Sequence, residues 1–83
     1  MPAALQYKSP RHRAVAEAAQ AAFDAGKRDV DLIAAIIDKV DEVRSAASLP
    51  QADTQTLTTF LMMTVMGADR DALPKAINGF NII

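Results

Sequence analysis

The amino-acid sequence predicts an all-α fold, a small bundle of three main helices followed by a short C-terminal helix. Alanine, the strongest helix former, supplies 17 of the 83 residues, whereas glycine, which interrupts helices, occurs three times. Each glycine follows a stretch with helical spacing of apolar residues, where a left-handed cap favours glycine. A chain of this length is expected to form a single domain over residues 1–83.

The first helix is predicted over residues 10–25, after an arm at residues 1–8 that we expect to be flexible. Ser9 followed by Pro10 is typical of a helix start, because the hydroxyl caps free amides and proline suits the first helical position. Gly26 would end this helix. Its apolar side chains are mostly alanines, so a partner helix could approach closely, although such small side chains bury little surface.

The second helix is predicted over residues 30–47, with Asp29 as its N-terminal cap. Large apolar residues recur at intervals of three and four residues, which is the strongest helical pattern in the chain; they are Ile33, Ile36, Ile37, Val40 and Val43. Aspartates and Glu42 occupy the other side. The Leu49-Pro50 pair marks the end of the segment, because proline disfavours helix in the residue before it.

The third helix is predicted to begin between Pro50 and Thr54 and to end at Met66. Five threonines in this stretch weaken the helical tendency, but no other segment offers a partner strand.

A short fourth helix would begin with Asp69 or Asp71 as its cap and would end before Gly79. The apolar tail at residues 80–83 is expected to dock on another part of the structure or on a partner. The predicted core comprises Val15, Ala19, Ala22, Phe23, Ile33, Ile36, Ile37, Val40, Val43, Leu57, Phe60, Leu61, Val65 and Ile77.

Composition argues against several functional classes. The chain has no cysteine, and its formal net charge is −1. Its longest mostly apolar stretch, at residues 57–66, is half of the about twenty residues that a membrane span needs. Without an export or membrane signal, we expect a cytoplasmic protein. His12, the single histidine, has no carboxylate three or four residues away, and no phosphate-binding or nucleophile motif is present. We therefore expect no enzyme, no metal site and no cofactor.

Basic residues concentrate near the N-terminus. Residues 1–28 carry a net charge of +3 and residues 29–83 carry −4. Four basic side chains precede or occupy the first helical turn, where free amides also favour an anion; they are Lys8, Arg11, His12 and Arg13. One hypothesis is an anion or nucleic-acid site. The alternative is a solvated turn whose charges pair with the acidic side of the second helix.

The third helix is apolar around most of its circumference. Leu57, Phe60 and Leu61 begin one stripe, and the methionines at positions 62, 63 and 66 lie outside it. Such a helix is either wholly buried or shared between chains, and methionine adapts well to a partner surface. We expect a partner-binding surface formed by Thr59, Met62, Met63, Met66, Phe80, Ile82 and Ile83. Burial of these side chains in the chain's own core is the alternative.

The sequence thus predicts a small non-enzymatic protein-interaction module, acting through its methionine-rich helix as a regulator, chaperone or assembly subunit. Because a single core of this size is marginal, self-association into a homodimer or a larger assembly is expected. The alternative function is a dimeric nucleic-acid-binding regulator that uses the basic arm and first turn. It is less favoured, since the second helix shows aspartate and isoleucine where a groove-reading helix would show basic and amide side chains.

Overall fold

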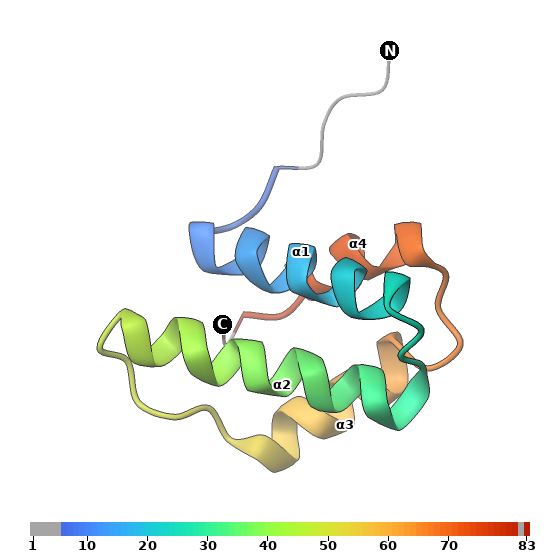
Figure 1. Cartoon of the computed structure of the whole chain (residues 1–83). Coiled ribbons are helices and arrows are strands. Elements are labelled where there is room, and N and C mark those ends of the chain that lie inside the picture. The colour runs from blue at the N-terminus through green and yellow to red at the C-terminus, as the bar shows by residue number, and fades with distance from the viewer. Residues whose placement is uncertain (1–5, 82) are drawn as a thin grey trace.

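The protein is all-α in the computed structural model, which describes residues 6–81 and 83. Its elements, in chain order, are α1 (Pro10–Asp24), α2 (Asp29–Ala46), α3 (Thr54–Thr64), the 3₁₀ turn η1 (Arg70–Ala72) and α4 (Leu73–Asn78) (Figure 1). The predicted fold class is confirmed. Within this described part of the chain, every helix is too short or too polar to cross a membrane.

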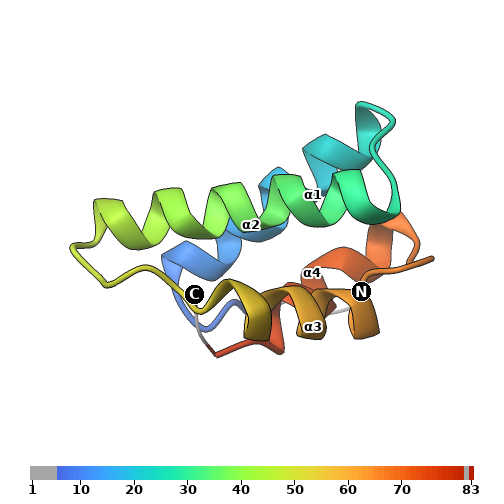
Figure 2. The same cartoon turned by 90° about the horizontal axis from the view of Figure 1, so that it is seen from below.

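The helices form two layers around the core. α1 and α2 are antiparallel and packed together, and α3 runs back along α2 (Figure 1). α4 and η1 pack against α1. The layer of α1 and α4 therefore lies over the layer of α2 and α3, which is in front when the molecule is seen from below (Figure 2). The C-terminal segment after α4 crosses from one layer to the other (Figure 1).

α1 begins and ends close to its predicted limits. The Ser9 hydroxyl accepts a hydrogen bond from the His12 backbone N–H at 3.2 Å, and Pro10 opens the helix. Gly26 turns the chain after the helix end, and its φ of +96° is a backbone conformation that residues with a Cβ rarely adopt. Val15 and three alanines of α1 are buried, which lets α1 lie close against its neighbours.

The start of α2 differs from the prediction, because Asp29 is its first residue and not its cap. Arg28 occupies the cap position, and Asp29 adopts a left-handed φ of +51°. The Arg28 guanidinium donates to the Phe23 and Lys27 carbonyl oxygens at 2.7 Å each, and it stacks 3.5 Å above the Phe23 ring. These local contacts of Arg28 therefore shape the turn, and its guanidinium covers the Phe23 ring.

α3 starts at Thr54 with Asp53 as its cap, inside the predicted range, and it ends at Thr64, two residues before the predicted end. The Thr64 hydroxyl donates to the Phe60 carbonyl oxygen at 2.9 Å. Gly67 then takes a left-handed φ of +72° and turns the chain away. Met66 consequently lies in the turn that follows α3.

α4 ends at Asn78, before Gly79, as predicted, but its start is not capped by an aspartate. Asp69 precedes η1 without a capping hydrogen bond from its side chain, and η1 leads directly into α4. Pro74 lies in the first turn of α4, where a missing N–H costs nothing.

The core differs from the prediction in both directions: some predicted members lie at its edge, and some buried residues were not predicted. Four predicted members, Phe23, Ile37, Val43 and Phe60, are only partly buried because they pack at the edge of the core. Buried apolar residues that the prediction missed are Ala16, Leu32, Ala52, Leu73, Phe80 and Ile83. The last two are buried because the C-terminal segment folds back, so the predicted docking of this tail takes place within the chain.

The predicted flexible arm is only partly described. Residues 1–5 lie outside the described residues, but the backbone N–H of Lys8 donates to Asn78 Oδ1 at 2.8 Å. The Gln6 carbonyl oxygen accepts from Asn78 Nδ2 at 3.0 Å. Residues 6–8 are therefore held by α4, because the Asn78 amide offers both a donor and an acceptor to the backbone.

Adjacent isoleucines of α2 test this description of the core. Ile36 is fully buried and Ile37 is only partly buried. We expect Ile36→Ala to lower the free energy of unfolding by about 2–5 kcal/mol, because it leaves a cavity, and Ile37→Ala to cost distinctly less. Urea unfolding followed by circular dichroism measures both. Equal losses in the two variants would contradict the assigned orientation of α2.

Candidate functional site

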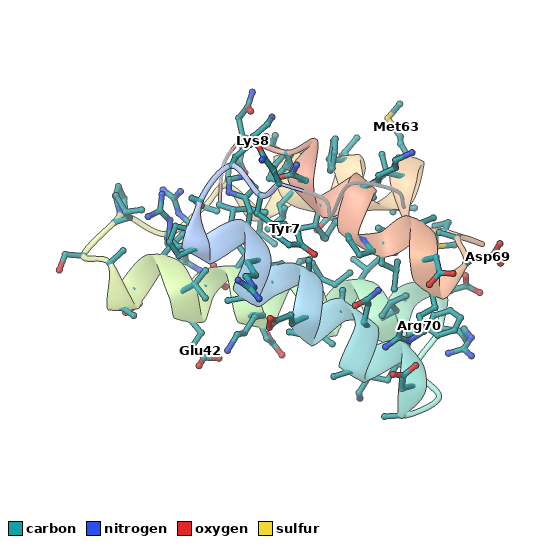
Figure 3. All side chains as sticks on the ribbon, turned by 90° about the horizontal axis from the view of Figure 1, so that it is seen from above. Tyr7, Lys8, Glu42, Met63, Asp69 and Arg70 are labelled. Atoms are coloured by element: carbon teal, nitrogen blue, oxygen red, sulfur yellow. The ribbon has the colours of Figure 1, made fainter. Side chains whose placement is uncertain are left out.

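The outer side of α3 and the turn after it carry a surface rich in methionine, called here the methionine face and formed by Thr59, Met62, Met63 and Met66. Leu57 and Leu61 point into the core and are each 1% exposed, whereas Met62, Met63 and Met66 are 54%, 81% and 43% exposed. Met63 extends away from the ribbon (Figure 3). The alternative that these methionines belong to an internal core is therefore wrong. Helical periodicity explains the exposure of Met62 and Met63, since they follow the core residue Leu61 by one and two positions and so lie about 100° and 200° from it around the helix axis.

The methionine face lies in an uncharged part of the chain. Residues 54–68 contain no Asp, Glu, Lys or Arg, and Asp53 and Asp69 flank this stretch. Exposed apolar side chains gathered on one face are typical of an interaction surface, and methionine is common where such a surface adapts to its partner. The face has the composition of a protein-binding surface.

An open groove of about 440 Å³ borders the methionine face; it is lined by Asp53, Gln55, Thr56, Thr59, Phe60, Met63 and Phe80. The rings of Phe60 and Phe80 stack with their centroids 4.4 Å apart and their planes 30° apart. The groove therefore combines an aromatic wall from α3 and the C-terminal segment with small polar side chains from the start of α3.

Two members of the predicted partner-binding surface are placed elsewhere. Phe80 and Ile83 are 8% and 2% exposed, so most of their surface is buried in this chain's own core. Phe80 contributes one edge to the groove. Ile82 lies outside the described residues. The sequence did not indicate this burial of Phe80 and Ile83, because a local apolar run does not reveal whether it will pack on its own chain.

Hydrogen bonds join the segment before α1 and its first turn to the segment after α4. We call this set of hydrogen bonds the terminal clasp, and it includes the two bonds between Asn78 and the backbone of Gln6 and Lys8 described above. Three side chains also donate to the C-terminal segment: Lys8 Nζ to Asn81 Oδ1 at 2.8 Å, Arg11 Nε to the Ile83 carbonyl oxygen at 2.9 Å, and His12 Nε2 to the Phe80 carbonyl oxygen at 2.6 Å. The clasp holds the C-terminal segment against the bundle, and so it positions Phe80 beside Phe60.

His12, which the sequence groups with the basic side chains of the first turn, is the buried centre of the terminal clasp. The residue is only 4% exposed. Nδ1 lies 2.6 Å from Ser9 Oγ, and Nε2 lies 2.6 Å from the Phe80 carbonyl oxygen. A carbonyl can only accept, so Nε2 carries the hydrogen. The Ser9 hydroxyl, which accepts from the His12 amide, also shares a hydrogen bond with Nδ1.

The predicted basic cluster does not converge on one anion. Lys8 and Arg11 donate to the C-terminal segment, and His12 is buried. Arg13 pairs with Glu17 on its own helix at 3.4 Å, and not with the acidic side of α2 as the alternative expected. Each described group in the cluster thus has a partner within the chain, and no observation favours a nucleic-acid surface there.

Sequence reasoning missed the groove altogether. Its aromatic wall joins Phe60 with a residue twenty positions later, and its polar end is formed by the capping residues Asp53 and Thr56. The aromatic character of both phenylalanines was the one available signal. It could not indicate that they would stack, because their contact depends on the path of the C-terminal segment.

No protein-family model, curated protein or solved structure matches this chain. Its function is therefore inferred from the geometry and chemistry of its own side chains.

Removing the histidine tests the terminal clasp. We expect His12→Ala to destabilise the fold by about 1–3 kcal/mol, because a buried carbonyl loses its donor, and Ser9→Ala by about 1 kcal/mol through the lost cap. The double variant should cost less than the sum, since the two side chains share a hydrogen bond. Urea unfolding gives all three values. Strictly additive losses, or no loss beyond that of the exposed variant Arg13→Ala, would argue against the clasp.

The cap of α3 predicts a pH dependence. The Thr56 hydroxyl and nearby backbone amides donate to Asp53 and hold the pKa of its carboxyl below the ordinary value of 3.8. The stabilisation is complete above that value and is lost as the pH falls through the lowered pKa, because protonation removes the acceptor. We expect Asp53→Asn to reduce the loss of stability on acidification, and Thr56→Val to reduce it in part. An unchanged acid profile in Asp53→Asn would contradict this assignment.

Proposed function

We propose that the protein is a non-enzymatic protein-interaction module that self-associates through the methionine face of α3. The observation that carries the proposal is the exposure of three methionines on the uncharged segment formed by α3 and the turn after it, with Met63 at 81%. Burying this apolar area against a protein removes it from water, which is the main driving force of protein association. As a self-associating module, the chain would serve as a regulator, chaperone or assembly subunit.

Two features support a second copy as the partner. In a two-fold interface the same patch meets itself, so charged side chains near the axis would face their own copies and repel. The uncharged stretch at residues 54–68 is free of this problem. The domain is also small enough that its own core is marginal, and association would add buried apolar surface.

The first test is the solution mass, measured by light scattering over a wide concentration range. We expect a dimer or larger assembly whose dissociation constant rises about tenfold or more in Met63→Lys, because a central interface residue carries a large share of the binding free energy. A concentration-independent monomer would overturn the proposal.

A matched variant controls for the added charge. Ala34→Lys introduces the same side chain at an exposed position of α2, between Asp31 and Asp38 on the helix surface. It should leave the association unchanged, and both variants should keep the helical circular dichroism of the parent protein. Equal effects of the two lysines would mean that net charge, and not the methionine face, controls association.

A further inference from the structure

We propose that two copies dock reciprocally, with Met63 of each copy inserted into the groove beside Phe60 and Phe80 of the other. This inference rests on the proposed self-association and adds the contact that performs it. The groove becomes a binding site for a methionine side chain, and the occupant is a second copy of this chain.

Met63 has the properties of the inserting side chain. It is 81% exposed, the highest value among the exposed large apolar residues, and it projects away from the bundle (Figure 3). Its side chain is unbranched, so it can adapt to the shape of a groove, and its sulfur makes favourable contacts with aromatic rings.

The groove has the properties of the receiving site. The stacked rings of Phe60 and Phe80 form an aromatic wall for the sulfur and methyl group. Thr56, Thr59 and Gln55 form the remaining sides without charge. Asp53, the one ionisable lining residue, has its carboxylate occupied by the Gln55 amide at 3.1 Å and the Thr56 hydroxyl at 2.7 Å. An apolar occupant would therefore leave no new unpaired charge in the groove.

The site is also held in place before binding. Phe80 is 8% exposed, and its carbonyl oxygen accepts from the buried His12 side chain. This hydrogen bond holds the Phe80 backbone in place, and the mostly buried Phe80 ring stacks on Phe60. A receiving site that is already ordered avoids the entropic cost of forming it during association.

Position favours a second copy over a different protein. Met63 both projects from the face and lines the groove, so the inserting and receiving features adjoin on one surface. A two-fold axis near Met63 and the groove forms two equivalent contacts at once, because Met63 of each copy then meets the groove of the other copy. The absence of charge at residues 54–68 makes that surface complementary to itself.

A mixing experiment tests the reciprocal contact. Met63→Ala removes the inserting side chain but keeps the Phe60 and Phe80 wall of the groove, and Thr59→Trp fills the groove but keeps Met63. In a dimer of either variant alone, both Met63–groove contacts are lost. We therefore expect the dissociation constant of that dimer to be about tenfold or more above that of the parent. An equimolar mixture restores one of the two contacts, so it should associate more tightly than either variant alone, as measured by sedimentation velocity.

The outcomes separate this inference from the proposed function. A parent protein that stays monomeric overturns the self-association itself. A dimeric parent whose two variants gain nothing on mixing overturns the reciprocal insertion and leaves the self-association standing. Both substitutions are at exposed positions, so the variants should remain folded, which circular dichroism verifies.

A second measurement locates the contact directly. In a dimer made from one methionine-methyl-labelled copy and one unlabelled copy, filtered NMR spectra report only contacts between copies. We expect the Met63 methyl group to show nuclear Overhauser effects to the aromatic protons of Phe60 and Phe80. Inter-copy effects confined to other methionine methyls would overturn the proposed insertion.

Discussion

The buried hydrogen bonds of His12 are the interaction on which the rest of the surface depends. One ring nitrogen lies 2.6 Å from the cap of α1 and the other lies 2.6 Å from the Phe80 carbonyl oxygen. This single side chain therefore satisfies polar groups at both ends of the chain in a place where unpaired groups would be costly. Because Phe80 is held there, its ring stacks on Phe60 and completes the groove.

The same packing explains why the chain leaves one helical face exposed. α3 contributes Leu57 and Leu61 to the core, and it packs along α2. Among the described residues, no element covers the exposed methionines on the outer side of α3. The methionine face is therefore the exposed apolar surface through which we propose that the chain self-associates.

The basic N-terminal segment forms hydrogen bonds that hold the distant C-terminal segment. Lys8, Arg11 and His12 each donate to the C-terminal segment, so their donors meet amide or backbone oxygens of residues 80–83. Cations at a helix N-terminus are unfavourable next to the positive end of the helix dipole. Acceptors supplied by the distant end of the chain offset that cost, and they also order the segment that forms the groove.

The sequence by itself determined the helices, because their signals are local. Apolar periodicity indicated α1 and α2, Ser9 and Gly26 marked the ends of α1, and the spacing of Met62, Met63 and Met66 separated them from the stripe that is buried. The burial of His12, the docking of Phe80 and Ile83, and the groove were decided only by the tertiary structure. The hydrogen bonds among these features join residues about seventy positions apart, and the groove joins α3 to the C-terminal segment. Helical periodicity cannot indicate such contacts, because it relates only neighbours three or four residues apart. Which distant acceptor meets a donor depends on how the layers pack.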